Sequence, residues 1–108
     1  MIHEPVEITL DDDEDESRLA TVKGVLDVFT SPTLATRTLA GLPETTRALV
    51  IDLREVSFVD SAGISALVRL RQEAKSRALD VHARLGGASK RMNSTVVDVV
   101  RRVLPCDD

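Results

Sequence analysis

Ser61 and its neighbours have the residue types and spacing best suited to chemistry in this chain of 108 residues. The pentapeptide VDSAG, residues 59–63, joins an apolar segment to a helical pattern. Asp60 suits an N-cap, because its carboxylate can accept a bond from a first-turn amide. Ser61 then takes the first helical position with its hydroxyl outward. Gly63 costs about 1 kcal/mol relative to alanine, which suggests a backbone that another group approaches closely. Two interpretations stay open: a cap and tight turn alone, or a serine presented to a partner.

A hydrolase is the first alternative, because the chain contains Ser61 and His82, and serine and histidine are the residue types of the nucleophile and base in a catalytic triad. The segment VDSAG, however, lacks the first glycine of the Gly-x-Ser-x-Gly nucleophile elbow. His82 lies in an alternating pattern typical of a strand. We expect no catalytic residue in this chain and no cofactor.

The acidic run DDDEDE, residues 11–16, resembles the start of a calcium loop. Glu16 stands where the tight-turn glycine belongs, and Val22 stands where the bidentate glutamate belongs. The run therefore predicts a solvated loop, residues 11–17, at the tip of a hairpin, and no metal site.

Composition excludes several classes of function. The net charge is −4, and without the six acids of residues 11–16 the chain has 12 acids against 14 bases. A nucleic-acid binder normally concentrates a strong positive field on one face, and this small excess of bases does not indicate one. Cys106 is the one cysteine, so no intrachain disulfide can form and a cytoplasmic location is the default expectation. No apolar run approaches the roughly 20 residues that span a bilayer, so no membrane contact is expected.

The elements that must position Ser61 follow from the periodicity of apolar residues. We expect one α/β domain over residues 1–108, with a mixed, mostly parallel β-sheet, helices packed on it and the order β-β-α-β-α-β-α. The pattern predicts strands over residues 6–10, 18–27, 48–53 and 79–85. It predicts helices over residues 30–43, 62–78 and 89–104. Ser31 can cap the first helix, with Pro32 at its first position, and Gly86-Gly87 makes a turn.

Two segments carry a resemblance to a known family. The stretch VIDLREVSFVDSAGISALVRLRQEA, residues 50–74, resembles the signature of the STAS domain in the branch of bacterial anti-sigma factor antagonists: an apolar strand ending in Asp-Leu, a short linker, then Asp-Ser-(Ser or Ala)-Gly-(Leu or Ile) opening a helix. The stretch GVLDVFTSPTL, residues 24–34, is similar to the family's Gly-Glu-Leu-Asp and short helix, with Val25 in place of glutamate.

The resemblance implies a binding switch. The unphosphorylated protein would bind an anti-sigma factor, typically a GHKL-type serine kinase, which then releases its sigma factor. Phosphorylation of Ser61 would end this binding, and a PP2C-type phosphatase would restore it. The residues expected at the partner surface are Asp27, Ser31, Asp60, Ser61, Ala62, Gly63 and Ile64. Free amides and the helix dipole should let the fold tolerate the phosphate. The alternative is a STAS scaffold or accessory subunit of a stress-signalling or transporter complex that is never phosphorylated.

Overall fold

A computed structural model describes residues 6–86 and 92–107 of the chain. Its strands are β1 (Glu7–Asp12), β2 (Ser17–Leu26), β3 (Ala48–Val59), β4 (Asp80–Arg84) and β5 (Cys106–Asp107). A 3-10 helix η1 (Ser31–Thr33) runs into α1 (Leu34–Ala40), and the other helices are α2 (Ser61–Ser76) and α3 (Ser94–Val103).

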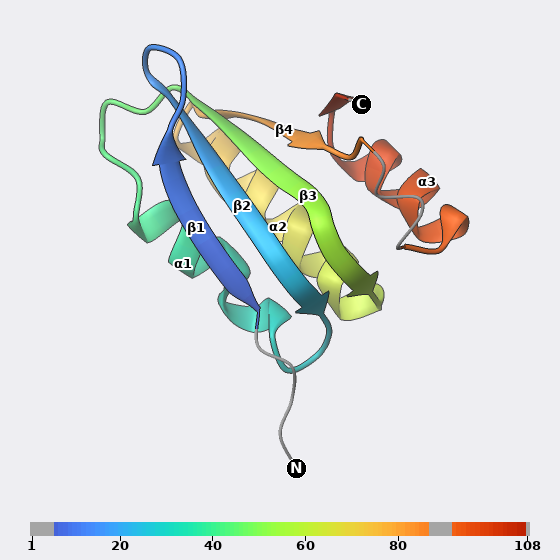
Figure 1. The fold of residues 1–108 in the computed structure, drawn as a ribbon. Coiled ribbons are helices and arrows are strands. Elements are labelled where there is room, and N and C mark those ends of the chain that lie inside the picture. The colour runs from blue at the N-terminus through green and yellow to red at the C-terminus, as the bar shows by residue number, and fades with distance from the viewer. Residues whose placement is uncertain (1–5, 87–91, 108) are drawn as a thin grey trace.

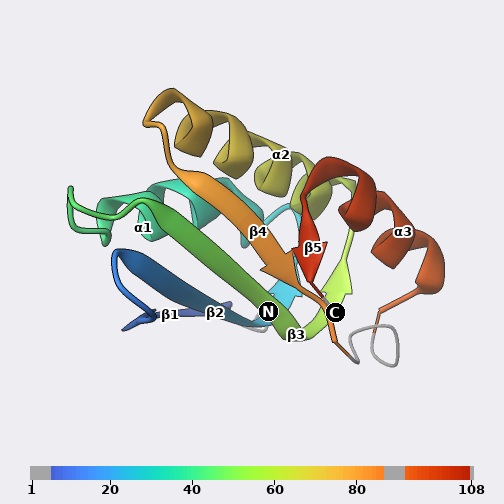
Figure 2. The same cartoon turned by 90° about the horizontal axis from the view of Figure 1, so that it is seen from above.

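The strands form one sheet in the order β1-β2-β3-β4-β5. β1 pairs antiparallel with β2, and the other three pairs are parallel, which confirms the mixed, mostly parallel sheet. Figures 1 and 2 show α1 and α2 together on one face of this sheet, with α3 beyond β4. Parallel neighbours end at the same edge, so the carboxyl ends of β2 and β3 meet beside the start of α2.

The core lies between the sheet and these helices and is aliphatic. The strands supply fully buried side chains such as Leu26, Leu49 and Ile51. On α2, the buried residues recur at helical spacing: Gly63, Ala66, Leu67, Leu70 and Ala74. Burial of a large aliphatic side chain contributes about 1.5–3 kcal/mol, so this stripe fixes the rotation of α2 and keeps the Ser61 side outward.

β3 is longer than predicted, because it runs to Val59 and contains the segment expected as a short linker. Two shifts in the pairing register of β3 with β2 interrupt the alternation of inward and outward side chains along β3. They fall between Thr21 and Lys23 and between Gly24 and Val25 of β2. Each shift inserts an extra residue into β3, which hides the period of two in the sequence. The extension brings β3 directly to Asp60.

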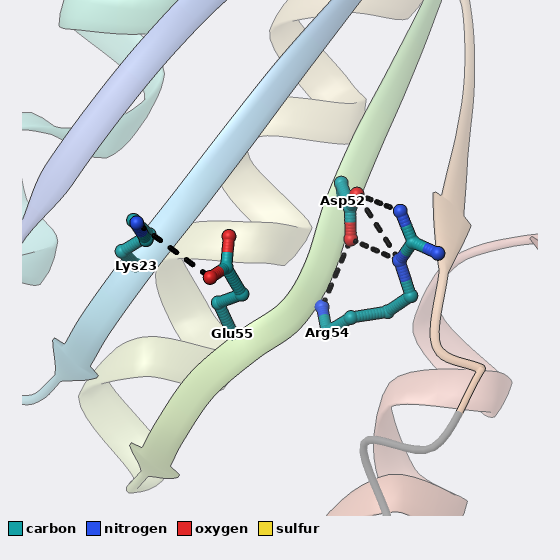
Figure 3. Close-up of polar contacts among 4 residues, drawn as sticks. All are labelled: Lys23, Asp52, Arg54 and Glu55. Atoms are coloured by element: carbon teal, nitrogen blue, oxygen red, sulfur yellow. Dashed lines mark hydrogen bonds and ion pairs between the residues drawn. The ribbon is translucent and has the colours of Figure 1, made fainter.

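Charged residues of β3 lie on the sheet face away from α2 (Figure 3). Asp52 is buried, yet it accepts hydrogen bonds from the Arg54 backbone amide (3.0 Å) and guanidinium (2.7 Å to Nη2). Burial alone would raise the pKa of Asp52, but the hydrogen bonds from Arg54 and the positive charges of Arg54 and Arg84 outweigh burial and hold that pKa below its ordinary value. Lys23 and Glu55 form an ion pair of 3.6 Å between β2 and β3.

The hairpin also differs from its predicted bounds. β1 extends through Asp11 and Asp12, which pair with Leu19 and Arg18 of β2. Asp12 and Arg18 form an ion pair of 3.2 Å, which favours strand pairing within the acidic run. The connection is therefore shorter than the predicted loop.

The first predicted helix is divided into η1 and α1, and Ser31 caps neither of them. Pro32 lies in the first turn of η1, as expected. The last helix is shorter than predicted, since Asn93 caps it and it begins at Ser94. Residues 89–91 of the predicted helix and Gly87 of the predicted turn lie outside the described residues.

β5 was not expected from the sequence. Two residues, Cys106 and Asp107, pair with Ala83 and Arg84 of β4 after α3 ends. A strand of this length has too little alternation to be recognised from its sequence pattern.

Candidate functional site

The turn at Ser61 has the local geometry that its sequence predicts. Asp60 is extended and caps α2: its Oδ1 accepts hydrogen bonds from the amides of Ala62 (2.9 Å) and Gly63 (3.1 Å). The Asp60 carbonyl accepts the Ile64 amide at 3.0 Å. Ser61 is the first residue of α2 and is exposed. Its hydroxyl is therefore accessible from solvent.

The same cap changes the expected electrostatics of the turn. Free amides of the first turn were expected to help the fold tolerate a phosphate, but the amides of Ala62 and Gly63 already donate to Asp60. A phosphate on Ser61 would have to displace this carboxylate or stay outside it. Since Asp60 and the phosphate carry the same sign of charge, the favourable helix dipole would be opposed by local repulsion.

Another group does approach the backbone at Gly63 closely, as its sequence suggested. Gly63 is buried, and a Cβ at this position would lie 2.5 Å from the carbonyl oxygen of Leu26 and 2.7 Å from Cγ1 of Val59. The group that approaches Gly63 closely therefore belongs to the chain itself. The amide of Asp60 also donates to Leu26 at 3.2 Å, so the turn is anchored on the end of β2.

The loop after β2 is held by a compact hydrogen-bond network. Asp27 Oδ1 accepts the amides of Phe29 (2.9 Å) and Thr30 (3.1 Å). The Thr30 hydroxyl donates to the carbonyl of Val25 at 2.6 Å, and the Ser31 amide donates to the carbonyl of Asp27 at 2.9 Å. Asp27 thus organises the loop, which lies beside the Ser61 turn because Leu26 and Val59 are register partners.

Large exposed apolar side chains stand at this edge of the sheet, where β2 and β3 end. Among the described residues, those in this class are Val28 (59% exposed), Phe29 (65%) and Phe58 (51%). Val28 and Phe29 come from the loop after β2, and Phe58 precedes Val59 at the end of β3. We call these three residues the apolar edge. Val28 lines a hollow with residues of α1 and α2, whereas Phe58 lines a second hollow with residues of α3, so the three side chains share this edge of the sheet without forming a single hollow.

Sequence reasoning did not single out the apolar edge. The signal was present, since two phenylalanines occur in the whole chain and both stand in the two stretches that carry the family resemblance. A strand pattern alone could not show which aromatic ring points outward, because the bulges of β3 break the alternation.

Besides the buried Gly63, two more residues expected at the partner surface are turned inward. Ser31 is only 3% exposed, and its hydroxyl has no hydrogen-bond partner among the described residues. Ile64 is half-buried and packs against the core. Ser31 is the buried residue of η1, and Ile64 lies in the first turn of α2, so sequence position near Ser61 did not ensure exposure.

A groove opens beside the Ser61 turn, between η1, α1 and α2. Its volume is about 460 Å³. The residues that line it are Val28, Ser31, Pro32, Ala35, Ala62, Ser65, Ala66 and Arg69. The groove therefore continues the apolar edge along α2.

The structure offers little support for other chemistry in its described parts. His82 lies on β4, as predicted, remote in the fold from the Ser61 turn, which rules out a direct serine–histidine pair. Within residues 6–86 and 92–107, no three histidine, cysteine or acidic side chains gather where they could hold a metal ion. None of the helices described is long and apolar enough to cross a membrane.

Comparison with known proteins identifies the domain. The family model of the STAS domain matches residues 11–99. A search among curated proteins gave no match. Among solved structures, the chain is similar to the anti-sigma factor antagonist SpoIIAA in its unphosphorylated form, with 16% identity, a TM-score of 0.63 and coverage of 94% of this chain and 88% of that one.

Two further structures show how widely this fold is used. An anti-sigma factor antagonist from Mycobacterium paratuberculosis is 26% identical, with a TM-score of 0.58 and coverage of 91% of this chain and 93% of that one. The murine Solute Carrier 26 family member A9 anion transporter is 20% identical, with a TM-score of 0.66, and 84% of this chain matches 14% of the transporter. Because the family match covers most of the chain and the folds agree, the protein belongs to the STAS domain family.

Proposed function

We propose that this STAS domain is an anti-sigma factor antagonist. In its unphosphorylated form it binds an anti-sigma factor, which then releases its sigma factor, and phosphorylation of Ser61 ends the binding. The observation that carries this proposal is the exposure of Ser61 at the first position of α2, next to the apolar edge. The partners are a GHKL-type serine kinase, which is the anti-sigma factor itself, and a PP2C-type phosphatase, in the bacterial cytoplasm. The domain is a regulator and not an enzyme.

The geometry supports binding of a protein surface at this edge. The loop of Asp27–Thr30 is held by its own hydrogen bonds, so little conformational entropy would be lost when Val28 and Phe29 contact a partner. Aromatic side chains supply much of the binding energy at interfaces. Ser61 starts α2 close to this loop, because the amide of the preceding Asp60 donates to the Leu26 carbonyl at the end of β2.

A phosphate on Ser61 would oppose this contact. It adds about −1.5 to −2 charge where Asp60 already carries negative charge. Burying that charge against the partner would be costly, since the amides of Ala62 and Gly63 are already occupied. A tenfold loss of affinity needs only about 1.4 kcal/mol, so one phosphate suffices for a switch.

The direct test combines the protein with ATP and each purified GHKL-type anti-sigma kinase of the source bacterium, followed by mass spectrometry. We expect one phosphate, on Ser61, and none on Ser61→Ala. Ser65→Ala is the matched control, because Ser65 is exposed one helical turn later on α2 and should leave phosphorylation unchanged. The second arm measures capture of the kinase by Ser61→Asp, which we expect to be abolished while the thermal transition stays nearly unchanged.

The alternative, a STAS scaffold or accessory subunit, is favoured by the likeness to the transporter domain. It makes a different prediction for the same experiment. A stable complex that forms with no phosphate on Ser61, and that survives Ser61→Asp, would reject the switch in favour of the scaffold. Global unfolding of Ser61→Asp would instead show that Ser61 is a structural residue of the turn.

A further inference from the structure

A hollow opens at the C-terminal end of α2, beside the first residues of β4. Its volume is about 380 Å³, within the range of about 300–1,000 Å³ that is usual for binding pockets. The residues that line it include Arg71, Lys75, Asp80, His82 and Pro105. At 1.5 Å per residue, Lys75 lies about 21 Å along α2 from Ser61. The hollow is therefore separate from the Ser61 turn and from the groove beside that turn.

Two long basic side chains of the hollow are available to a partner. Arg71 and Lys75 are four positions apart on α2, so they lie on the same side of the helix. The Arg71 guanidinium is held in place, because its Nη1 donates to the carbonyl of Val103 at 3.0 Å. Lys75 is exposed and forms no ion pair with any described residue. Asp80 supplies one negative charge against these two positive charges, so the hollow favours an acidic partner.

One wall of the hollow is an open edge of the sheet. β4 pairs with β3 along its whole length, but with β5 only at Ala83 and Arg84. The amide of Ala83 points to the β5 side, where it donates to the carbonyl of Pro105 at 2.7 Å. The backbone polar groups of Val81, two residues earlier, face the same side, and none of the described strands lies next to them there. Backbone groups at an open edge are ready to bond to another chain.

The chain itself carries a group of matching charge, which we call the acidic tip: residues 13–16 of the β1–β2 hairpin. All four residues are acidic and exposed. Glu14 and Asp15 form no ion pair with any described residue. The tip is held in one conformation, because the Ser17 amide donates to the carbonyl of Glu14 at 2.9 Å. Like charges on a fixed turn repel one another, so contact with bases of another molecule would stabilise the acidic tip.

The acidic tip and the hollow lie at the same end of the molecule (Figure 1). Across this end, the Arg47 amide donates to the carbonyl of Glu16 at 2.8 Å, and the Asp80 amide donates to the carbonyl of Arg47 at 3.0 Å. Neighbouring strands are about 4.8 Å apart, so β2 and β4, with β3 between them, are about 10 Å apart. When two complementary patches share one end, a two-fold axis brings each against its counterpart, and the contact closes as a dimer.

We propose that a second copy of this chain docks its acidic tip into the hollow. Glu14 and Asp15 of each copy face Arg71 and Lys75 of the other copy, and the two-fold axis forms this contact twice. A second copy fits because the described chain carries both halves of the contact and pairs neither with the other. Ser61 lies at the far end of α2, so both copies keep it exposed, and the dimer does not rest on the proposed function.

Sedimentation equilibrium of the full chain tests this dimer. We expect a concentration-dependent dimer at about 0.1 M salt that weakens at about 1 M salt, because the Debye length falls from about 10 Å to about 3 Å. A chain that stays monomeric at low salt up to about 1 mM protein would overturn the proposal. A dimer of the same strength at both salt concentrations would also overturn it, because its contact would not be between charges.

Charge reversal identifies the two surfaces. Glu14→Lys and Lys75→Glu should each weaken the dimer at least about tenfold. The double variant again places opposite charges across the contact, and it should dimerise within about threefold of the wild type. Glu7→Lys and Arg69→Glu are the matched controls, because each makes the same change of charge at an exposed position outside the acidic tip and the hollow. Equal weakening by a control, or no recovery in the double variant, would refute this contact.

Discussion

At the scale of single residues, Asp60 connects the stability of α2 with the proposed switch. Its carboxylate holds the amides of Ala62 and Gly63, and its own amide is bound to Leu26. Ser61 follows directly, so the residue that would receive a phosphate stands next to a fixed negative charge. Phosphorylation would therefore act on the surface of the turn, with some weakening of the cap.

Replacement of Asp60 by alanine tests the cap. Asp60→Ala should lower the free energy of unfolding by about 1 kcal/mol, because two first-turn amides lose their acceptor. Urea denaturation measures this change. Asp60→Asn is the control, since asparagine caps helices about as well as aspartate does. Equal stability of the alanine and asparagine variants would contradict the role assigned to this carboxylate.

At the scale of elements, the contact of α2 with β2 and β3 positions the site. The carboxyl ends of the two strands lie beside the first turn of the helix, where Gly63 packs against the Leu26 carbonyl and Val59. With its two bulges, β3 stays paired with β2 beyond residue 53, where the predicted strand ends, and reaches Val59 next to Asp60. The proposed partner surface therefore depends on how closely one helix packs on two strands.

A methyl group at position 63 tests this packing. Gly63→Ala should lower the free energy of unfolding by about 1–2 kcal/mol, because the clash with the Leu26 carbonyl exceeds the gain of about 1 kcal/mol in helix propensity. Thermal and urea unfolding measure the change. Ser65→Ala, an exposed position of the same helix, should be neutral or slightly stabilising. A Gly63→Ala variant as stable as the wild type would show that α2 can move away from β2 at no cost.

At the scale of the whole molecule, the two faces of the sheet are stabilised differently. One face is covered by α1 and α2 over an aliphatic core, and the other carries the Asp52–Arg54 pair (Figure 3). The lowered pKa of Asp52 makes the stability of the domain depend on pH. This contribution is complete above the ordinary pKa of aspartate, about 3.9, and is lost as the pH falls toward the lower pKa of the folded state.

Removal of Arg54 tests this dependence. In Arg54→Ala, Asp52 should no longer stabilise the folded state when it is ionised. The free energy of unfolding of the variant should therefore differ most from that of the wild type near neutral pH, and the difference should narrow below about pH 4. Urea unfolding between about pH 7 and pH 3 measures it. Arg69→Ala removes an exposed arginine that pairs with no described carboxylate and should leave the pH profile unchanged. If the free energies of unfolding of Arg54→Ala and the wild type differ by the same amount at every pH, Arg54 does not couple the ionisation of Asp52 to stability.

The sequence by itself determined the features that depend on neighbouring residues. The Asp60 cap, the first-turn position of Ser61 and the apolar repeat of α2 follow from local hydrogen bonding and helical periodicity. The parallel order of the later strands follows from their alternation with helices.

Only the tertiary structure decided the features that depend on residues far apart in the chain. Gly63 packs against Leu26, Ser31 turns inward, and β3 reaches Val59 only through its pairing with β2. Val28, Phe29 and Phe58 are all exposed at the same end of the sheet because two parallel strands end together. Periodicity carries no information on which distant backbone a residue will meet, so the environment of Ser61 emerged only when the sheet and its helices were assembled.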